Sequence, residues 1–335
     1  MGCSIEAIEY VFPKNKVTNQ DLEREFPEYD FEKFENKVGI KTRYVVADDQ
    51  TALDLALAAS EKLFERGYDK NEIDYVLYCT QSPEYILPTT ACILQDRLKL
   101  RKNIGAFDFN LGCSGFTYGV SFAKALIDSK QAKKILLITA ETYSKFIHPK
   151  DRSNRSIFGD AATATLLVET NEKNIGEFLF GTDGNGYDKL IIKNGASRHK
   201  FSENCEIKNY GTNNTYTDNH LYMDGPEIFN FTSNIIPNFT LEVLEKNKLQ
   251  KEDIHQFIFH QANAFMLSFM RKRLKVATEK FYIDLNDGGN TVSNTIPIAL
   301  KNYSQTLQKP QNIMLVGFGV GLSWSGGLLK INKLL

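Results

Sequence analysis

A cysteine among small residues is the first position in this sequence that could do chemistry. Cys113 lies in the segment 110–116, which reads Asn-Leu-Gly-Cys-Ser-Gly-Phe. The apolar stretch 104–109 predicts a strand before it, and the helical spacing of apolar residues over 116–127 predicts a helix after it. Because N–H groups and the positive dipole at a helix start favour a thiolate, we expect a lowered pKa for the Cys113 thiol. Cys113 is therefore a candidate nucleophile, although free cysteines also serve as small buried residues at tight turns.

A histidine and an asparagine in the second half of the chain also follow apolar stretches. His260 begins His-Gln-Ala-Asn after the stretch 257–259, and Asn290 lies in the segment Gly-Gly-Asn-Thr. Alone, His260 would be a hydrogen-bonded structural residue and Asn290 a turn residue beside glycines. Because strand ends converge at one edge of an α/β sheet, the two side chains can instead meet Cys113 and form a catalytic Cys, His, Asn set.

With these motifs the sequence resembles the β-ketoacyl-acyl-carrier-protein synthase III family of the thiolase superfamily, from Ile5 to Lys330. The order and spacing of six segments carry the resemblance, namely 110–116, 151–152, 157–162, 260–263, 289–291 and 316–324. It implies an α/β, thiolase-like fold of two related halves packed as a layered α-β-α-β-α structure. The half 1–172 would carry the nucleophilic cysteine, and the half 173–335 would carry the histidine and the asparagine.

The resemblance implies a reaction. Cys113 would attack an acyl thioester, with its own N–H and that of Val320 forming the oxyanion hole. His260 and Asn290 would stabilise the thioester oxygen of a malonyl group that loses carbon dioxide, and the carbanion would then attack the acyl group. This is a decarboxylative Claisen condensation in fatty-acid or related lipid or polyketide biosynthesis. Two alternatives stay open: transfer of the acyl group to an alcohol or amine without decarboxylation, and a non-catalytic subunit of the same fold.

Further substrate-binding residues are implied by the same resemblance. Leu87 stands where relatives project an aromatic side chain from the partner subunit into the acyl pocket. Phe318 would shield the site from water, or serve as a core aromatic residue, and Gly319 would let the backbone approach the thioester. Arg152 and Lys37 match, or lie near, basic residues of relatives that use coenzyme A.

Two kinds of thioester donor are compatible with the resemblance. Acyl-coenzyme A and acyl-carrier-protein thioesters are the expected substrates, with no other cofactor and no metal. Lys33 stands where relatives that use coenzyme A often have a tryptophan stacked on adenine, which makes a carrier-protein donor more attractive. The sequence has a run of basic residues, Arg271, Lys272 and Arg273. This run is explained either by a solvated helix face or by a docking surface for an acidic carrier protein.

The elements that must position these residues alternate between strand and helix, which indicates α/β layers. The stretch 52–64 predicts a helix that ends before Gly67. A second helix is expected from Pro226 to Leu244, with an interruption at Pro237.

A faint internal repeat indicates two related halves. The stretches 72–79 and 253–260 share an acidic residue, an isoleucine, two variable residues and an apolar run. The stretches 134–139 and 312–317 match in the same order. By contrast, the segment 194–219 is polar and rich in Asn and Thr. It is expected to be a solvated surface loop, with a lid that contacts substrate as the alternative.

Composition sets limits on the class of protein. The chain has 335 residues, 42% hydrophobic residues and a formal net charge of −1, so it can bury a large core and has no general attraction to nucleic acid. No apolar run approaches the roughly 20 residues that span a bilayer, and no signal peptide is evident. The 5 cysteines are scattered, which predicts neither disulfides nor a zinc site. We expect a cytoplasmic homodimer with no membrane partner.

Overall fold

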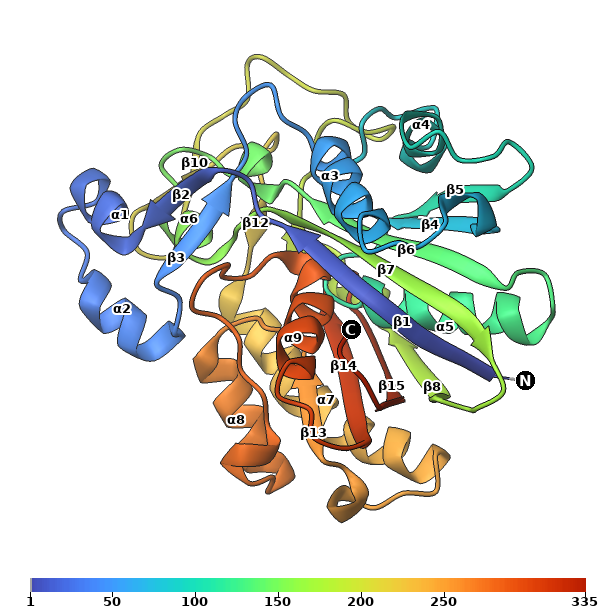
Figure 1. Ribbon diagram of the computed structural model, residues 1–335. Helices are drawn as coiled ribbons and strands as arrows, with labels where there is room; N and C mark the ends of the chain where they lie inside the picture. The colour runs from blue at the N-terminus through green and yellow to red at the C-terminus, as the bar shows by residue number, and fades with distance from the viewer. Residues whose placement is uncertain (1) are drawn as a thin grey trace.

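Two β-sheets form the centre of the molecule in the computed structural model, which describes residues 2–335 (Figure 1). The strand order of the first sheet is β1-β7-β6-β4-β5, and that of the second is β13-β14-β15-β8. The first contains β1 (Gly2–Val11), β7 (Ala161–Thr170), β6 (Lys134–Glu141), β4 (Tyr75–Cys79) and β5 (Gly105–Phe109). The second contains β13 (Gln256–Phe259), β14 (Gln311–Gly319), β15 (Ser323–Ile331) and β8 (Ile175–Thr182).

The two sheets repeat one arrangement of strands. β4 is parallel to β6, as β13 is to β14, and the next two pairings are antiparallel in both sheets. The order β1-β7-β6-β4 therefore corresponds to β8-β15-β14-β13, with β5 as an additional edge strand of the first sheet. These pairings confirm the two related α/β halves expected from the repeat.

Helices fill three layers around the sheets. α5 (Gly115–Asp128) and α9 (Thr295–Ser304) pack between the sheets, and α3 (Ala52–Phe64) and α4 (Thr90–Arg97) cover the first sheet on its outer side. α7 (Gly225–Lys246) covers the second sheet, with α8 (Ala264–Leu274) beside it. Side chains such as Phe116, Leu315 and Ile296 form the buried core between the sheets. The expected layered α-β-α-β-α architecture is confirmed.

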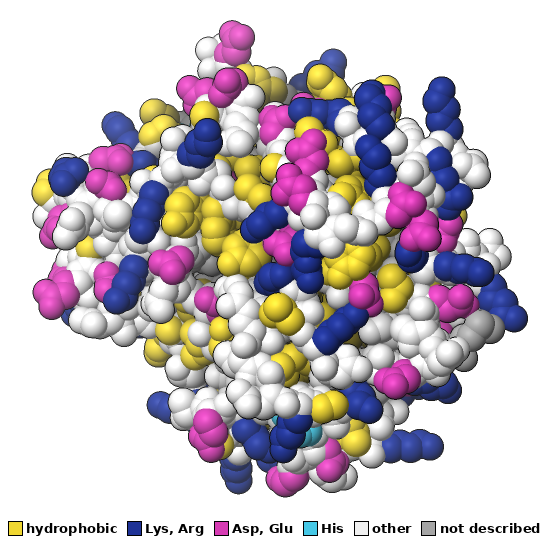
Figure 2. Space-filling view, in the orientation of Figure 1, with side chains coloured by type: hydrophobic (Ala, Val, Ile, Leu, Met, Phe, Trp, Pro, Cys, Tyr) yellow, Lys and Arg dark blue, Asp and Glu magenta, His cyan; other side chains and the backbone are white. Residues whose placement is uncertain are grey.

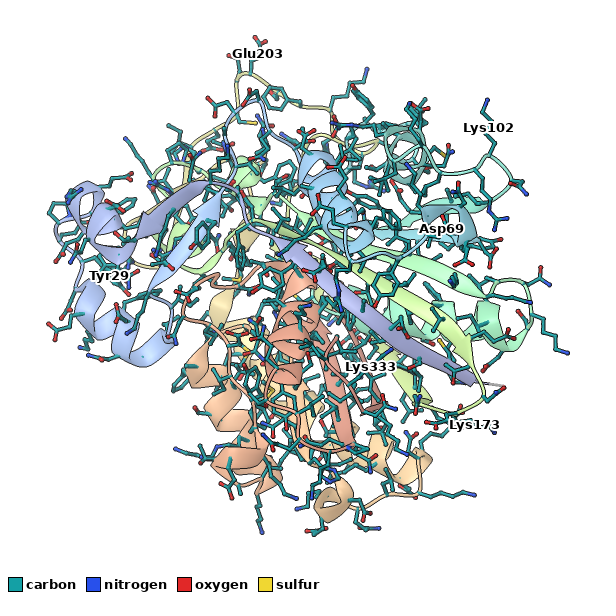
Figure 3. All side chains as sticks on the ribbon, in the orientation of Figure 1. Tyr29, Asp69, Lys102, Lys173, Glu203 and Lys333 are labelled. Carbon is teal, nitrogen blue, oxygen red and sulfur yellow. The ribbon has the colours of Figure 1, made fainter. Side chains whose placement is uncertain are left out.

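Shorter elements lie at the end of the molecule where the catalytic candidates are. They comprise β2 (Asn15–Thr18), α1 (Asn19–Glu25), α2 (Phe31–Val38), β3 (Thr42–Val45), α6 (Arg152–Ile157), β9 (Leu190–Ile191), β10 (Lys208–Tyr210), β11 (Asn214–Tyr216) and β12 (Tyr222–Met223). β10 and β11 form a hairpin inside the segment 194–219, which sequence patterns did not predict. Figure 3 shows Glu203 of this segment at the outer surface.

The long helices match the sequence patterns except at one proline. α3 has the expected bounds, with a capping box between Thr51 and Asp54 at its start. The expected interruption of the later helix at Pro237 is wrong, because α7 runs through this residue. Pro237 removes one backbone donor, but the flanking Ile236 and Phe239 are buried. Packing of α7 against the second sheet on both sides of Pro237 therefore keeps the helix continuous.

The surface carries both signs of charge. Figure 2 shows basic and acidic side chains interspersed over one face of the molecule, in keeping with the net charge of −1. Within residues 2–335, no helix combines the length and the apolar character needed to cross a membrane.

Candidate active site

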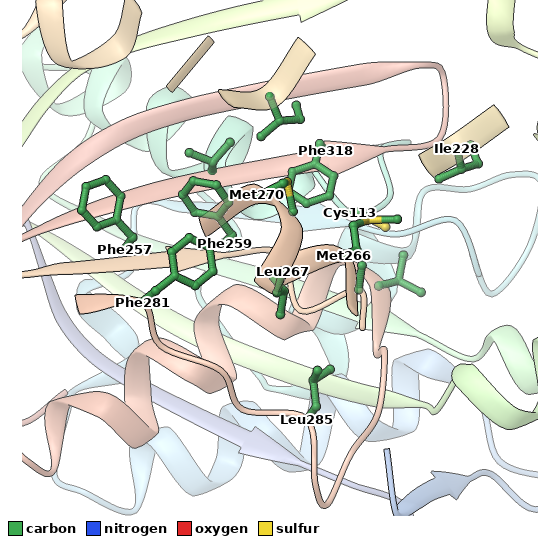
Figure 4. Packing of buried hydrophobic residues seen from close by; sticks show 14 of the residues in the cluster. Cys113, Ile228, Phe257, Phe259, Met266, Leu267, Met270, Phe281, Leu285 and Phe318 are labelled. Atoms are coloured by element: carbon green, nitrogen blue, oxygen red, sulfur yellow. The ribbon is translucent and has the colours of Figure 1, made fainter. Parts of the chain in front are cut away.

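Cys113 lies in the loop between β5 and α5 and is buried. Its side chain rests against Gly319 at the end of β14, where a Cβ atom would lie 2.9 Å from Cys113 Cβ and 3.0 Å from Sγ. A Cβ at Gly112 would likewise come within 2.6 Å of Val320 Cγ1. Glycine at these two positions lets the cysteine loop and the end of β14 pack together (Figure 4).

The thiol of Cys113 is not activated as the sequence suggested. α5 begins at Gly115, so Cys113 precedes the helix by two residues. Burial raises the pKa of the Cys113 thiol to about 12, with a further contribution from the nearby Glu141 carboxyl group. The expected lowering of the pKa is wrong for the free protein, because loss of hydration outweighs the N–H groups of the helix start.

His260 follows β13 directly and is buried. Its Nδ1 is 2.7 Å from Oγ1 of Thr295, and the ring packs edge-on against Phe318, with 5.5 Å between ring centroids. Burial lowers the pKa of His260 to about 3, so the imidazole is neutral at physiological pH. The Thr295 contact uses Nδ1 and leaves Nε2 for a substrate.

Hydrogen bonds of both the backbone and the side chain hold Asn290 in place. Its N–H donates to the carbonyl of Ile157 at 3.0 Å, and its carbonyl accepts from the N–H of Gly159 at 3.1 Å. Its Oδ1 accepts from the N–H of Val292 at 2.9 Å. Because Oδ1 is occupied in this way, Nδ2 is the group that can donate to a substrate.

The end of β14 contacts both Cys113 and His260. Phe318 contacts the ring of His260, and the next residue, Gly319, contacts Cys113. Asn290 is paired by a parallel bridge with Phe158, whose ring packs 5.3 Å from that of Tyr143. Burial raises the pKa of Tyr143, with further contributions from Glu141 and Cys113, and Tyr143 belongs to the same hydrophobic cluster as Cys113.

The predicted oxyanion hole has two backbone donors. Among the described residues, neither the N–H of Cys113 nor that of Val320 donates to another backbone carbonyl outside the regular elements. The Val320 carbonyl accepts from Oγ of Ser323 at 3.1 Å, which fixes this turn. The two N–H groups can therefore serve a ligand.

Two predicted substrate-binding residues contact other side chains of the chain. The Arg152 guanidinium lies 3.5 Å from the ring centroid of Tyr29, and its Nη2 donates to the Thr212 carbonyl at 3.1 Å. Lys37 lies over the ring of Phe265, with Nζ 5.0 Å from the centroid. Figure 3 places Tyr29 at the α1–α2 end of the molecule.

The remaining predicted residues lie at the surface. Leu87 is 80% exposed in a loop before α4. Lys272 and Arg273 are exposed in the last turn of α8. Arg271 instead donates through Nη1 to the Val276 carbonyl at 2.8 Å, which stabilises the end of that helix.

Sequence patterns missed several residues that frame the site. Thr295 orients His260, Tyr143 donates through its hydroxyl to Gln81 Oε1, and Glu141 is fully buried next to them. The sequence signal for Glu141 was a carboxylate two residues after the run 134–139. Among the described residues, no cluster of His, Cys, Asp or Glu side chains that could hold a metal is found.

Comparison with known proteins establishes the family. The model of 3-oxoacyl-[acyl-carrier-protein] synthase III matches residues 107–184, and the model of its C-terminal part matches residues 244–331. A β-ketoacyl-[acyl-carrier-protein] synthase III from Clostridium perfringens is 38% identical over 323 residues, which cover 95% of this chain and 96% of the relative. The chain belongs to the 3-oxoacyl-acyl-carrier-protein synthase III family. A second member of the family, from Clostridium tetani, is 36% identical over 320 residues and 95% of both chains.

Solved structures of family members have the same fold. A crystal structure of a 3-oxoacyl-(acyl-carrier-protein) synthase III is 41% identical, with a TM-score of 0.96 over 99% of this chain and 100% of that chain. The synthase III from Thermus thermophilus is 31% identical, with a TM-score of 0.86 over 98% and 99%. The thiolase-like fold is confirmed. As a family member, the chain is an acyl-transferring enzyme of the condensing type, and acyl transfer to an alcohol or amine is not favoured.

Proposed function

We propose that this chain condenses an acyl group held on Cys113 with a malonyl thioester, releasing carbon dioxide and a β-ketoacyl thioester for fatty-acid or related lipid synthesis. The observation that carries the proposal is the end of β14, where Phe318 contacts His260 and Gly319 contacts Cys113. Carbon–carbon bond formation needs the two reacting groups held side by side in one site.

The first step forms the acyl-enzyme. The sulfur of Cys113 attacks the donor thioester, and the N–H groups of Cys113 and Val320 stabilise the oxyanion. Because burial keeps the thiol protonated and His260 neutral, we assign the thiol proton to Nε2 of His260, which returns it to the departing thiolate.

The second step makes the new bond. The malonyl group loses carbon dioxide, and its thioester oxygen accepts hydrogen bonds from His260 Nε2 and Asn290 Nδ2. The carbanion attacks the acyl carbonyl, and collapse of the tetrahedral intermediate expels the thiolate of Cys113, which takes up a proton from water to restore the thiol. The hydroxyl of Thr295 can either donate to or accept from Nδ1 of His260, so both protonation states of Nε2 are compatible with that contact.

A carrier protein is the proposed partner for both thioesters, and no further cofactor is required. One face of Arg152 is already stacked on Tyr29, and Lys33 offers no aromatic ring, which weakens the case for stacking the adenine of coenzyme A. The exposed Lys272 and Arg273 on α8 would attract the acidic surface of a carrier protein.

A homodimer is the proposed assembly. β5 is an edge strand of the first sheet and carries the partly exposed Phe107. Tyr85, Ile86 and Leu87 are 60%, 87% and 80% exposed and form a consecutive apolar run at the surface, as is typical of a protein–protein interface. Pairing of two β5 edges would cover this region and bring Leu87 to the partner's acyl pocket.

Mass spectrometry of the intact protein tests the proposal. The protein and its Cys113→Ala variant are incubated with acyl-coenzyme A and acyl-carrier-protein donors, and then with malonyl carrier protein. We expect an acyl adduct on the unmodified sequence alone, followed by a β-keto product two carbons longer. Adducts that never extend, or that pass to an alcohol or amine, would overturn condensation.

A further inference from the structure

Glu141 is a buried acid that the proposed mechanism does not use. It ends β6 and accepts hydrogen bonds from three residues. The N–H of Gln81 donates at 3.1 Å and the hydroxyl of Ser82 at 3.1 Å, both from the half that carries Cys113. The hydroxyl of Ser293 donates at 3.2 Å from the other half. Glu141 thus ties together two segments that are far apart in the sequence.

Ser293 belongs to a strained turn next to Asn290. The preceding residue, Val292, has φ of 58°, a left-handed conformation that a β-branched side chain rarely adopts. Such a conformation persists only where surrounding contacts determine it, and it is frequent at functional sites. The contacts that hold Val292 therefore also hold Asn290, two residues before it.

Hydrogen bonds fix this turn on both sides. Before the strained residue, Oδ1 of Asn290 accepts from the N–H of Val292 at 2.9 Å. After it, Ser293 donates to Glu141, and Nδ2 of Asn294 donates to the Thr291 carbonyl at 2.9 Å. The first of these bonds also determines which way the Asn290 amide faces, because it occupies Oδ1 and leaves Nδ2 for the site.

We infer that Glu141 is a positioning residue: through Ser293 it holds the Val292 turn, so that Nδ2 of Asn290 faces the malonyl thioester. The inference rests on the proposed role of Asn290 in decarboxylation. The bonds of Glu141 to Gln81 and Ser82 set the position of this turn relative to the half that carries the nucleophile.

The environment of Glu141 suits this role. Burial raises the pKa of its carboxyl group to about 8, so the group is largely neutral at pH 7. A neutral carboxyl group and an amide have similar shape and both accept from hydroxyl groups. Glutamine should therefore substitute for Glu141 far better than alanine.

The test measures the two chemical steps separately. Acylation of Cys113 is followed by intact-protein mass spectrometry in a single turnover, and decarboxylation by release of labelled carbon dioxide from malonyl carrier protein. We expect Glu141→Ala and Ser293→Ala to slow carbon dioxide release about tenfold to a hundredfold, while acylation changes less than about threefold. Glu141→Gln should keep most of the activity. Equal losses in both steps, or no rescue by glutamine, would overturn the inference.

A matched control variant and an Asn290→Ala background distinguish the positioning of Asn290 from a general loss of structure. Glu9 is another buried acid, which accepts from Nη1 of Arg66 at 3.1 Å and from Nζ of Lys301 at 2.9 Å. Glu9→Gln should not slow decarboxylation more than acylation. A selective loss of decarboxylation in this variant, as large as that of Glu141→Ala, would contradict the inference.

In an Asn290→Ala background, Ser293→Ala should cause no further loss of carbon dioxide release. A full additional loss would show that Ser293 acts independently of Asn290. If Asn290→Ala alone leaves carbon dioxide release intact, the proposed role of Asn290 is wrong, and the inference fails with it.

Discussion

The position of the Cys113 thiol depends on the absence of a Cβ atom at Gly319. A Cβ at this position would lie 2.9 Å from Cys113 Cβ, closer than side chains tolerate. We expect Gly319→Ala to displace the thiol and to slow acylation about tenfold to a hundredfold. The rate of adduct formation measures this effect. Gly184→Ala is the matched control, since a Cβ there meets nothing within 4 Å, and an equal loss in that variant would contradict the explanation.

Burial of the Cys113 thiol predicts its reactivity in the free protein. With a pKa of about 12, the thiolate fraction rises about tenfold for each pH unit and does not level off below pH 10. Iodoacetamide should therefore label Cys113 slowly, at a rate that still increases between pH 7 and pH 10. The Cys113→Ala variant corrects for labelling of the other cysteines. A plateau below pH 8 would indicate an activated thiolate.

At the residue scale, sequence patterns identified the candidates but not their environment. Cys113 and His260 each follow a strand, as expected, whereas Asn290 lies in the stretch between α8 and α9, where the structure has no strand; the motifs of all three made them visible. The pKa of Cys113 was predicted in the wrong direction, because helix position is a local property while burial depends on the whole fold. Glu141 was missed for the same reason, since its partners come from residues 81, 82 and 293.

At the scale of elements, α8 offers a test of carrier-protein docking. Lys272→Glu should raise the KM for a carrier-protein substrate about tenfold and leave acylation of Cys113 by acyl-coenzyme A unchanged, because only the protein partner meets the helix. Steady-state kinetics at low and high salt would measure this, with a smaller salt dependence expected for the variant. Lys173→Glu, exposed between β7 and β8, is the control. If both charge-reversal variants raised the KM for the carrier-protein substrate equally, docking on α8 would be refuted.

Elements with strong local signals were predicted well, and those held by distant contacts were not. α3 and α5 have apolar residues at helical spacing, and both form within one residue of the expected bounds. α7 continues through Pro237 because the second sheet supports it on both sides. The β10–β11 hairpin depends on Tyr210, whose hydroxyl donates to Asp151 at 2.8 Å, and no pattern within 194–219 reveals that partner.

At the scale of the whole molecule, the edge of the first sheet predicts the assembly. The protein should sediment as a particle of twice 38.0 kDa. Phe107→Asp should shift it towards a single subunit, because a charge on β5 opposes pairing of two edges. Analytical ultracentrifugation measures the shift. Leu241→Asp, at a partly exposed position on α7, should leave the mass unchanged. A single-subunit mass for the unmodified sequence would contradict the dimer.

The repeated strand order has a consequence for the history of the molecule. β1-β7-β6-β4 and β8-β15-β14-β13 have one topology, as expected after duplication of an ancestral gene. Cys113 lies in the first copy, whereas His260 and Asn290 lie in the second. Two identical ancestral subunits would have carried the same side chains at equivalent positions. Separate encoding of the two halves allows each to specialise, so that one now supplies the nucleophile and the other the hydrogen-bond donors.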